Sequence, residues 1–263
     1  MSRKFHDGTA FEITGQGHDI VLIHGLGLNR HMWQWLVPEL ETRYRVITYD
    51  ILGHGESKNP ENTPRLSQYA DQLAQLLDCC GSDQAAVAGF SLGGMIGRHF
   101  ALDYPDKLSA LGIISSAHGR TEQERAAVLK RVEQARESGP SATLEAALER
   151  WFTPGYASDH PDVMNLVREW IMTNDPEIYP SIYRMMAQGD IELADTVNAI
   201  SCPVLVMTGA DDSGNSPDMA RRMAKLMPSA QVEIVHGLRH MGLVEAPEKF
   251  NQPLINFLNS HIS

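Results

Sequence analysis

Short apolar runs alternate with helix-forming segments along most of this chain, and that alternation limits the fold more than any other feature. Each run has the continuous hydrophobicity of a strand covered on both faces, and each helical segment can carry the chain back to a parallel neighbouring strand. We therefore expect an α/β fold, a mostly parallel sheet with helices on both faces. An Asp7-Gly8 turn between β-prone flanks adds a hairpin over residues 3–14. The expected strands are residues 19–24, 44–49, 84–90, 108–115, 203–208 and 231–235, and the expected helices are residues 30–40, 66–80, 91–104, 217–227 and 247–258.

The alternation stops between residues 119 and 199. This stretch contains helix patterns alone, with residues 122–137 and 142–152 rich in Ala, Glu, Arg and Leu, and Pro and Gly residues interrupt it. The strand pattern then resumes. We therefore expect a core built from residues 1–118 and 200–263, with an inserted helical cap over residues 119–199.

Charge argues against two classes of partner. The 263 residues carry 22 basic and 33 acidic side chains, which gives a net charge of −11. Such a chain repels nucleic acid and anionic membrane surfaces, so neither is expected as a partner. No apolar run reaches the roughly 18 residues that span a bilayer. No apolar region follows the positive charges at the start, and we expect a cytoplasmic protein.

Metal and cofactor motifs are missing from the sequence. Cys79, Cys80 and Cys202 are odd in number, and their spacing suits neither a disulfide framework nor a metal site. The chain has no dinucleotide fingerprint, no P-loop and no HExxH motif. We therefore expect neither a metal nor a cofactor.

The strongest local motif is Gly89-Phe90-Ser91-Leu92-Gly93, where an expected strand meets an expected helix. A serine on such a sharp turn has strained backbone angles, and the glycines on either side remove Cβ atoms that would collide there. The turn raises the serine hydroxyl above the sheet, and the first amides of the helix point toward it. The motif therefore predicts a nucleophile elbow with Ser91 as the nucleophile.

A serine hydroxyl becomes a good nucleophile only when a histidine, oriented by an acid, takes its proton. His240 follows the last expected strand, at the carboxyl end where open sheets bind ligands, and His236 is a rival in the same loop. The preceding strand ends in Asp211 and Asp212, and spacing alone does not choose between them. The chain order Ser91, Asp212, His240 is the order in which such sites are built on this kind of sheet.

Attack on a carbonyl creates an oxyanion, which needs two backbone N–H donors. One is expected from Leu92, directly after the serine. The other is expected from Leu26, in the loop His24-Gly25-Leu26-Gly27 after the first parallel strand. Glycines on both sides of Leu26 let its amide turn toward the serine.

Together these motifs resemble the α/β-hydrolase superfamily over essentially the whole chain. HGLG, YDILGHGES, GFSLGG, GADD and GLRHMGLVEAPEKF occur in family order and with family-like spacing. The resemblance implies the α/β-hydrolase fold, Asp212 rather than Asp211 as the acid, and a non-catalytic role for Asp50 at the site mouth. The cap and its flanks resemble the branch of 3-oxoadipate enol-lactonases and carboxylesterases. Ser91 excludes the alkyl-enzyme chemistry of dehalogenases and epoxide hydrolases, which have an aspartate at the elbow.

The resemblance implies a serine hydrolase that cleaves a small carboxylic ester or lactone through an acyl-enzyme intermediate. Trp151, Phe152 and Met185 of the cap are our candidates for the apolar lining of the substrate pocket. A small helical insertion must also bury a face of its own, which competes for the same side chains.

Three alternatives stay open. An enol-lactone with a carboxylate would need a local cation in a protein of charge −11. Arg150, Arg168 and Arg184 are available, but we expect each on a solvated helix face, so a neutral ester is the first choice and the anionic lactone the second. A sensor that keeps the triad and binds a small molecule with slow turnover is a different class of function. A homodimer is compatible with the sequence.

Overall fold

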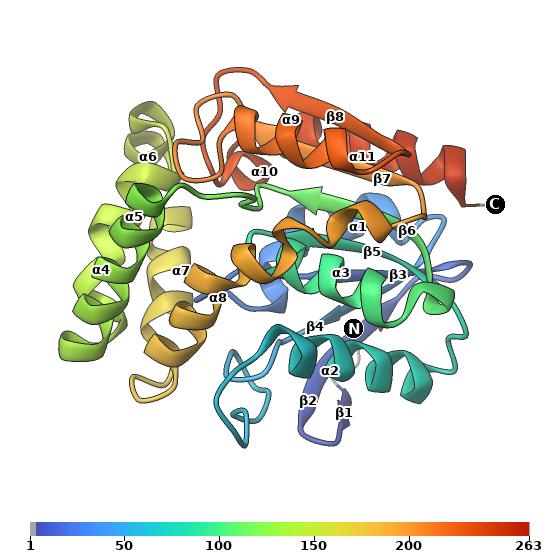
Figure 1. Ribbon diagram of the computed structural model, residues 1–263, viewed down its shortest axis with the longest axis horizontal. Helices are drawn as coiled ribbons and strands as arrows, with labels where there is room; N and C mark the ends of the chain where they lie inside the picture. Colours follow the sequence, from blue (N-terminus) through green and yellow to red (C-terminus); the bar gives the residue numbers. More distant parts are fainter. Residues whose placement is uncertain (1–3, 263) are drawn as a thin grey trace.

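Figure 1 shows the computed structural model of the chain, in which residues 4–262 are described. One eight-stranded sheet has the order β1-β2-β4-β3-β5-β6-β7-β8. β2 pairs antiparallel with β1 and β4, and all other neighbours are parallel. The mostly parallel sheet expected from the sequence is therefore confirmed. The strands are β1 (Lys4–His6), β2 (Thr9–Thr14), β3 (Asp19–Ile23), β4 (Arg45–Tyr49), β5 (Ala85–Phe90), β6 (Leu108–Ile114), β7 (Val204–Gly209) and β8 (Ala230–Val235).

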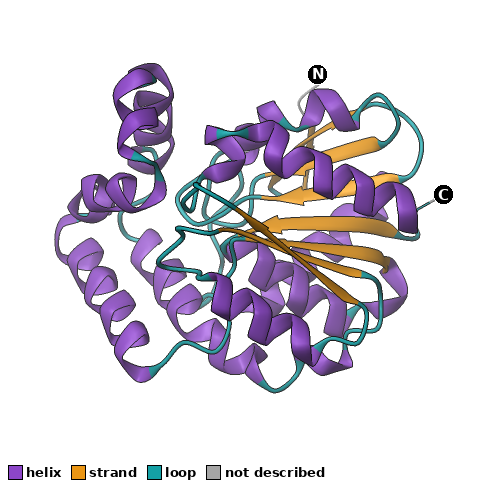
Figure 2. Cartoon of the chain, turned by 90° about the horizontal axis from the view of Figure 1, so that it is seen from above, coloured by secondary structure: helices purple, strands orange, loops and turns teal. Residues whose placement is uncertain are grey.

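Helices cover both faces of the sheet, as Figure 2 shows. Alternate side chains of β3 illustrate why: Val21 and Ile23 enter one buried cluster, and Ile20 and Leu22 enter the other. The first face is covered by α2 (Leu66–Cys80), α3 (Leu92–Asp103) and α9 (Pro217–Leu226). The second face is covered by the 3₁₀ segment Arg30–Trp35, α1 (Val37–Leu40), α10 (Gly242–Glu245) and α11 (Pro247–His261).

The segment between β6 and β7 is helical and lies to one side of the sheet, green to yellow in Figure 1. Its helices are α4 (Glu122–Ser138), α5 (Leu144–Trp151), α6 (Pro154–Asp159), α7 (Pro161–Met172) and α8 (Tyr179–Ala194). Helix α8 packs closely on the core, since a Cβ on Gly189 would lie 2.9 Å from the Leu66 side chain of α2. Within residues 4–262, no helix is both long and apolar enough to cross a membrane.

Two local expectations have different outcomes. The hairpin forms around Asp7 and Gly8, both at positive φ (44° and 76°), while residue 3 of the expected hairpin lies outside the described residues. The single helix expected over residues 30–40 is instead a 3₁₀ segment followed by the single turn of α1. Pro38 explains the break, because it has no N–H to donate to the carbonyl of Gln34 one turn earlier.

The turn between β5 and α3 is the tightest point of the fold. Ser91 has φ 54° and ψ −110°, a conformation that few non-glycine residues adopt. A Cβ on Gly89 would overlap the carbonyl of Gly93, and a Cβ on Gly93 would overlap the carbonyl of Ile23 in β3. The two glycines therefore let α3 start directly against the ends of β3 and β5.

Gly93→Ala tests this close approach. We expect it to lower the free energy of unfolding by about 3 kcal/mol, because the new methyl group meets backbone that has no room to yield. Gly155→Ala in α6 is the matched control. Open space surrounds that position, so the free energy of unfolding should stay the same or rise by up to about 1 kcal/mol. Urea denaturation measures both, and equal effects would contradict the expectation.

Candidate active site

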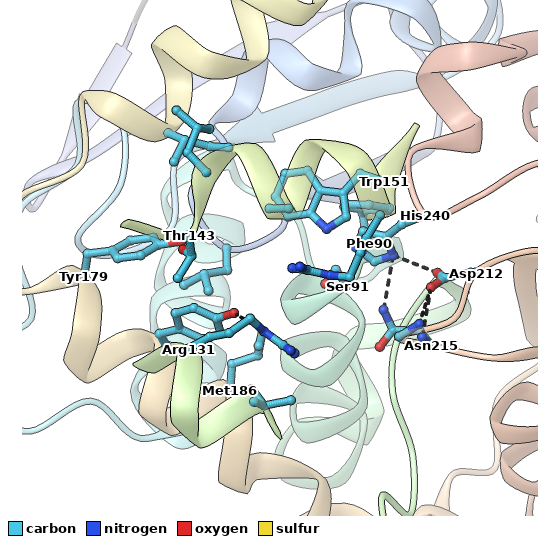
Figure 3. Close-up of a pocket in the computed structure, with 18 of the residues that line it drawn as sticks. Phe90, Ser91, Arg131, Thr143, Trp151, Tyr179, Met186, Asp212, Asn215 and His240 are labelled. Carbon is cyan, nitrogen blue, oxygen red and sulfur yellow. Dashed lines mark hydrogen bonds and ion pairs between the residues drawn. The ribbon is translucent and has the colours of Figure 1, made fainter. Parts of the chain in front are cut away.

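Four loops at the carboxyl ends of parallel strands bring distant residues into one pocket. Leu26 follows β3, Ser91 follows β5, Asp212 follows β7 and His240 follows β8. All four residues line the same pocket, and α4, α5, α7 and α8 contribute its opposite wall (Figure 3). A parallel sheet directs the loops after its strands to one edge, which explains the convergence.

The imidazole of His240 pairs with a buried carboxylate. His240 Nδ1 lies 2.7 Å from Asp212 Oδ2, and both side chains are almost fully buried. The other oxygen of Asp212 accepts the backbone N–H groups of Gly214 (3.0 Å) and Asn215 (2.9 Å), which fixes the carboxylate. With Nδ1 as the donor to Asp212, Nε2 is the basic nitrogen of the ring.

The rivals left open by spacing lie elsewhere. Asp211 is exposed, whereas Asp212 is 3% exposed. His236 is also exposed, in the turn that follows β8. Of the two aspartates Asp212 lines the pocket, and of the two histidines His240 does. In each loop the residue nearer the strand lies outside, because the chain needs several residues to turn back over the edge of the sheet.

Ser91 lies beside His240 in Figure 3. The rings of Phe90 and Trp151 flank the imidazole, with centroids 4.8 Å and 5.6 Å from its own. Within residues 4–262 the Ser91 hydroxyl forms no hydrogen bond. Catalytic hydrogen bonds of this kind are often long before substrate binds and shorten in the complex.

Two backbone amides next to Ser91 are available to a ligand. The N–H groups of Leu26 and Leu92 donate to no acceptor in the described part of the chain, although both residues are buried. Leu92 is the first residue of α3, where an amide has no acceptor within the helix. Gly25 brings the Leu26 loop close, since a Cβ there would lie 3.3 Å from Ser91 Cβ. Such a pair of donors can stabilise a negative oxygen.

Two buried histidines hold the Leu26 loop in place. His54 Nε2 accepts the N–H of Gly27 at 2.9 Å, and His24 Nε2 accepts the N–H of Ile51 at 3.0 Å. Each Nδ1 faces a backbone carbonyl, which the neutral ring satisfies as a donor. Burial lowers the pKa of His24 to about 4 and that of His54 to about 3. The sequence carries no signal for the role of His54, because Gly27, whose N–H it accepts, is 27 residues away.

Sequence reasoning also missed the support beneath the serine. The Ser116 hydroxyl donates to the carbonyl of Ser91 at 2.7 Å and accepts from Arg98 Nη2 at 3.1 Å. Arg98 is fully buried in α3, and its other bonds go to the carbonyls of Gly94 and Ala117. A fully buried guanidinium bonded to carbonyls is unusual, and burial lowers the pKa of Arg98 to about 9.

Asn215 is a further residue that the sequence did not single out. Its side-chain amide lies 3.1 Å from His240 Nδ1, and the residue lines the pocket. It follows Asp212 by three positions, in the turn that the carboxylate organises. It therefore completes the polar surroundings of the imidazole.

The expected apolar lining is partly wrong. Trp151 lines the pocket, but Phe152 and Met185 do not. Phe152 is 1% exposed and stacks on Tyr156, and Met185 is packed in the core that α8 shares with the sheet helices. The inserted helices bury these two side chains to cover themselves and the sheet, whereas Met186, one residue further along α8, faces the pocket.

The pocket contains more positive charge than we expected from the sequence. Arg120, Arg131 and Arg150 line it. Arg168 and Arg184, the other cations considered from the sequence, lie on exposed surfaces and pair with Glu145 and Glu133. Within residues 4–262, no group of three or more His, Cys, Asp or Glu side chains is arranged to hold a metal ion.

Comparison with known proteins identifies the family. A family model described as alpha/beta hydrolase fold matches residues 20–247. This chain belongs to the α/β-hydrolase family. The likeness is not confined to those residues, because named relatives align with nearly the whole length of this α/β-hydrolase.

Three relatives of this α/β-hydrolase are informative. The (E)-2-((N-methylformamido)methylene)succinate hydrolase of Acinetobacter baylyi is 29% identical over 246 residues, 94% of this chain and 92% of the relative. The 3-oxoadipate enol-lactonase 2 of the same organism is 29% identical over 232 residues, 88% and 85% of the two chains. The enol-lactonase structure from Burkholderia xenovorans LB400 has a TM-score of 0.89 at 26% identity, covering 98% of this chain and 100% of that one. The resemblance to the enol-lactonase branch is therefore confirmed, and the names place this α/β-hydrolase among hydrolytic enzymes.

The buried His54 predicts a pH dependence of stability. In an unfolded chain histidine binds a proton near pH 6.5, whereas folded His54 does so only near pH 3. Between these values the unfolded chain binds more protons, so the group's contribution is present above pH 6.5 and is lost as the pH falls. We expect the stability deficit of His54→Gln to be smaller at pH 5 than at pH 7.5, because the wild type alone loses that contribution.

Urea denaturation at the two pH values measures this difference. His236→Gln is the matched control, because an exposed imidazole has similar surroundings in the folded and unfolded chain. A deficit of His54→Gln that stays constant or grows toward pH 5 would contradict the expected buried, neutral ring.

Proposed function

We propose that this α/β-hydrolase is a serine hydrolase that cleaves a small carboxylic ester or lactone through a covalent acyl-enzyme. The pairing of His240 with the buried Asp212, in the pocket that Ser91 lines, is the observation that carries the proposal. The two unpaired amides of Leu26 and Leu92 supply the remaining component. A hydroxyl, a base, an acid and two N–H donors are the set that acyl transfer through serine requires.

The chemistry follows from these positions. Nε2 of His240 takes the proton of the Ser91 hydroxyl as the oxygen attacks the substrate carbonyl. The Leu26 and Leu92 amides stabilise the tetrahedral oxyanion, and the Asp212 carboxylate stabilises the imidazolium. His240 then gives the proton to the leaving alkoxide, which leaves an acyl group on Ser91. Water, deprotonated by the same imidazole, attacks the acyl group, and the acid departs as the serine recovers its proton.

The chemistry of the leaving group and the names of relatives both support an ester or lactone as the bond that is cleaved. An ester or lactone has an alkoxide leaving group, for which protonation by a single imidazole suffices. The names of two relatives, a 3-oxoadipate enol-lactonase and an enol-lactonase of known structure, support the lactone as the second candidate beside the open-chain ester. The rings of Phe90 and Trp151 against His240 favour small substituents near the reacting carbonyl.

A ligand sensor built on the same site would differ in turnover. An enzyme should cycle many times on a short ester such as p-nitrophenyl butyrate, whereas a sensor should release one equivalent of product and then stop. The polar groups beside Ser91, which are His240, Asn215 and the amides of Leu26 and Leu92, support turnover, because water must reach the acyl group for the second half of the cycle.

Ser91→Ala tests the nucleophile. We expect kcat for short p-nitrophenyl esters to fall by about ten-thousand-fold or more, because the covalent route is lost. A fluorophosphonate probe should label wild-type protein at Ser91 and leave the variant unlabelled, with peptide mass mapping as the measurement.

Ser181→Ala is the matched control, since this serine is exposed on α8 and lies outside the pocket. It should keep both activity and labelling. Labelling at another serine, or full activity in Ser91→Ala, would contradict the assignment. A wild type that hydrolyses no ester or lactone would instead favour the sensor.

A further inference from the structure

The arginines of helices α4 to α8 fall into two groups. Four have a carboxylate partner, and the two without one, Arg131 and Arg150, both line the pocket. This absence of partners holds within the described residues. In a chain with 33 acidic and 22 basic side chains, two such cations at one pocket concentrate positive charge in an acidic protein. The paired arginines are Arg125 with Asp190, Arg136 with Glu133, Arg168 with Glu145 and Arg184 with Glu133.

Arg131 presents its guanidinium to the pocket. Its Nε donates to the Tyr183 hydroxyl at 3.1 Å, and Tyr183 is buried on α8. Its two terminal nitrogens have no partner among residues 4–262. In Figure 3 the side chain points into the pocket between Met186 and Ser91. The bond to Tyr183 therefore fixes the side chain at Nε and leaves its two terminal nitrogens available. Two such nitrogens of a guanidinium can bind a carboxylate bidentately.

Arg150 lies on α5, which lines the same pocket as α4. One terminal nitrogen donates to the carbonyl of Ala146 at 2.6 Å, and the next residue, Trp151, has its ring 5.6 Å from that of His240. Burial, and after it the positive charge of Arg131, lower the pKa of Arg150. The two guanidinium groups therefore repel each other, and an anion bound between them would offset that repulsion.

The other charged residues of the pocket each have a partner of opposite charge. Arg120 pairs with the fully buried Asp190, at 3.5 Å between Nη1 and Oδ1. Asp212 is the one carboxylate among the pocket-lining residues of the described chain, and it is bound to His240. Arg131 and Arg150 are therefore the pocket-lining cations that have no carboxylate partner in residues 4–262, in a protein whose net charge is −11.

We propose that Arg131 and Arg150 form a carboxylate-binding subsite, so that the substrate is an ester or lactone that carries a free carboxylate away from the bond that is cleaved. This inference rests on the proposed function and reverses the preference for a neutral ester that the sequence suggested. The carboxylate binds between the two guanidinium groups while the scissile carbonyl lies at Ser91. Two charge-assisted contacts at a fixed place also set the distance between carboxylate and carbonyl, and hence the length of the substrate.

Matched pairs of esters test the charge. Monomethyl succinate, glutarate and adipate are compared with methyl butyrate, pentanoate and hexanoate, with methanol release as the measurement. We expect kcat/KM of the best monoester to exceed that of its neutral counterpart by about 10- to 100-fold. Added sodium chloride should raise KM for the monoester and leave that of the neutral ester unchanged. A preference for the neutral series would overturn the inference.

Variants locate the subsite. Arg131→Gln and Arg150→Gln should each lower the ratio of kcat/KM for the monoester to kcat/KM for its neutral counterpart by about tenfold or more, mainly through KM for the monoester. Arg168→Gln is the matched control, because that arginine lies on a neighbouring helix outside the pocket and pairs with Glu145. The midpoint of urea denaturation shows whether each variant is folded. Equal losses on both series would overturn the inference.

A binding experiment separates this inference from the proposed function. Glutarate is titrated calorimetrically into the wild type and into the double variant Arg131→Gln/Arg150→Gln. Binding that the double variant loses supports the subsite even if no ester is cleaved, in which case the hydrolase proposal alone fails. Turnover of neutral esters without glutarate binding and without preference for monoesters overturns the subsite alone.

Discussion

The start of α3 against the ends of β3 and β5 is the contact on which the rest of the site depends. Ser91 has φ 54° and ψ −110°, and such a backbone persists only where its surroundings leave no alternative. Those surroundings are the glycine contacts at Gly89 and Gly93, the bond from Ser91 N–H to Ile114 O at 2.8 Å, and the Ser116 hydroxyl on the Ser91 carbonyl. One arrangement therefore fixes both the hydroxyl and the Leu92 amide beside it.

The arginines inside the protein differ in how their charge is offset. Arg30 is buried and pairs with Asp50, Glu12 and Glu56, so its charge is fully offset and it holds the loop after β4. Arg98 is equally buried but bonds to carbonyls and to the Ser116 hydroxyl beneath Ser91. Like Arg98, the pocket-lining Arg131 and Arg150 have no acidic partner in residues 4–262, so positive charge gathers near Ser91 in an acidic protein.

Local sequence patterns predicted the parallel strands and the turn at Ser91. The continuous apolar runs located the parallel strands, and the glycine spacing around Ser91 located the elbow, because both follow from backbone geometry that neighbouring residues decide. Phe152 and Met185 were assigned to the pocket incorrectly, since helix periodicity identifies an apolar face but not what covers it. His54 was missed because its contact with Gly27 spans 27 residues.

The sequence by itself determined the order of strands and helices, the strained turn at Ser91 and the two loops that contain the candidate base and acid. Each of these depends on residues within a few positions of one another. The tertiary structure shows the contact of Asp212 with His240 that the resemblance had implied and spacing had left open. It alone decided that Arg131 and Arg150 face the pocket with no acidic partner in residues 4–262, while Arg168 is paired outside the pocket. Those choices depend on the angle at which distant helices and loops pack, and no local pattern specifies that angle.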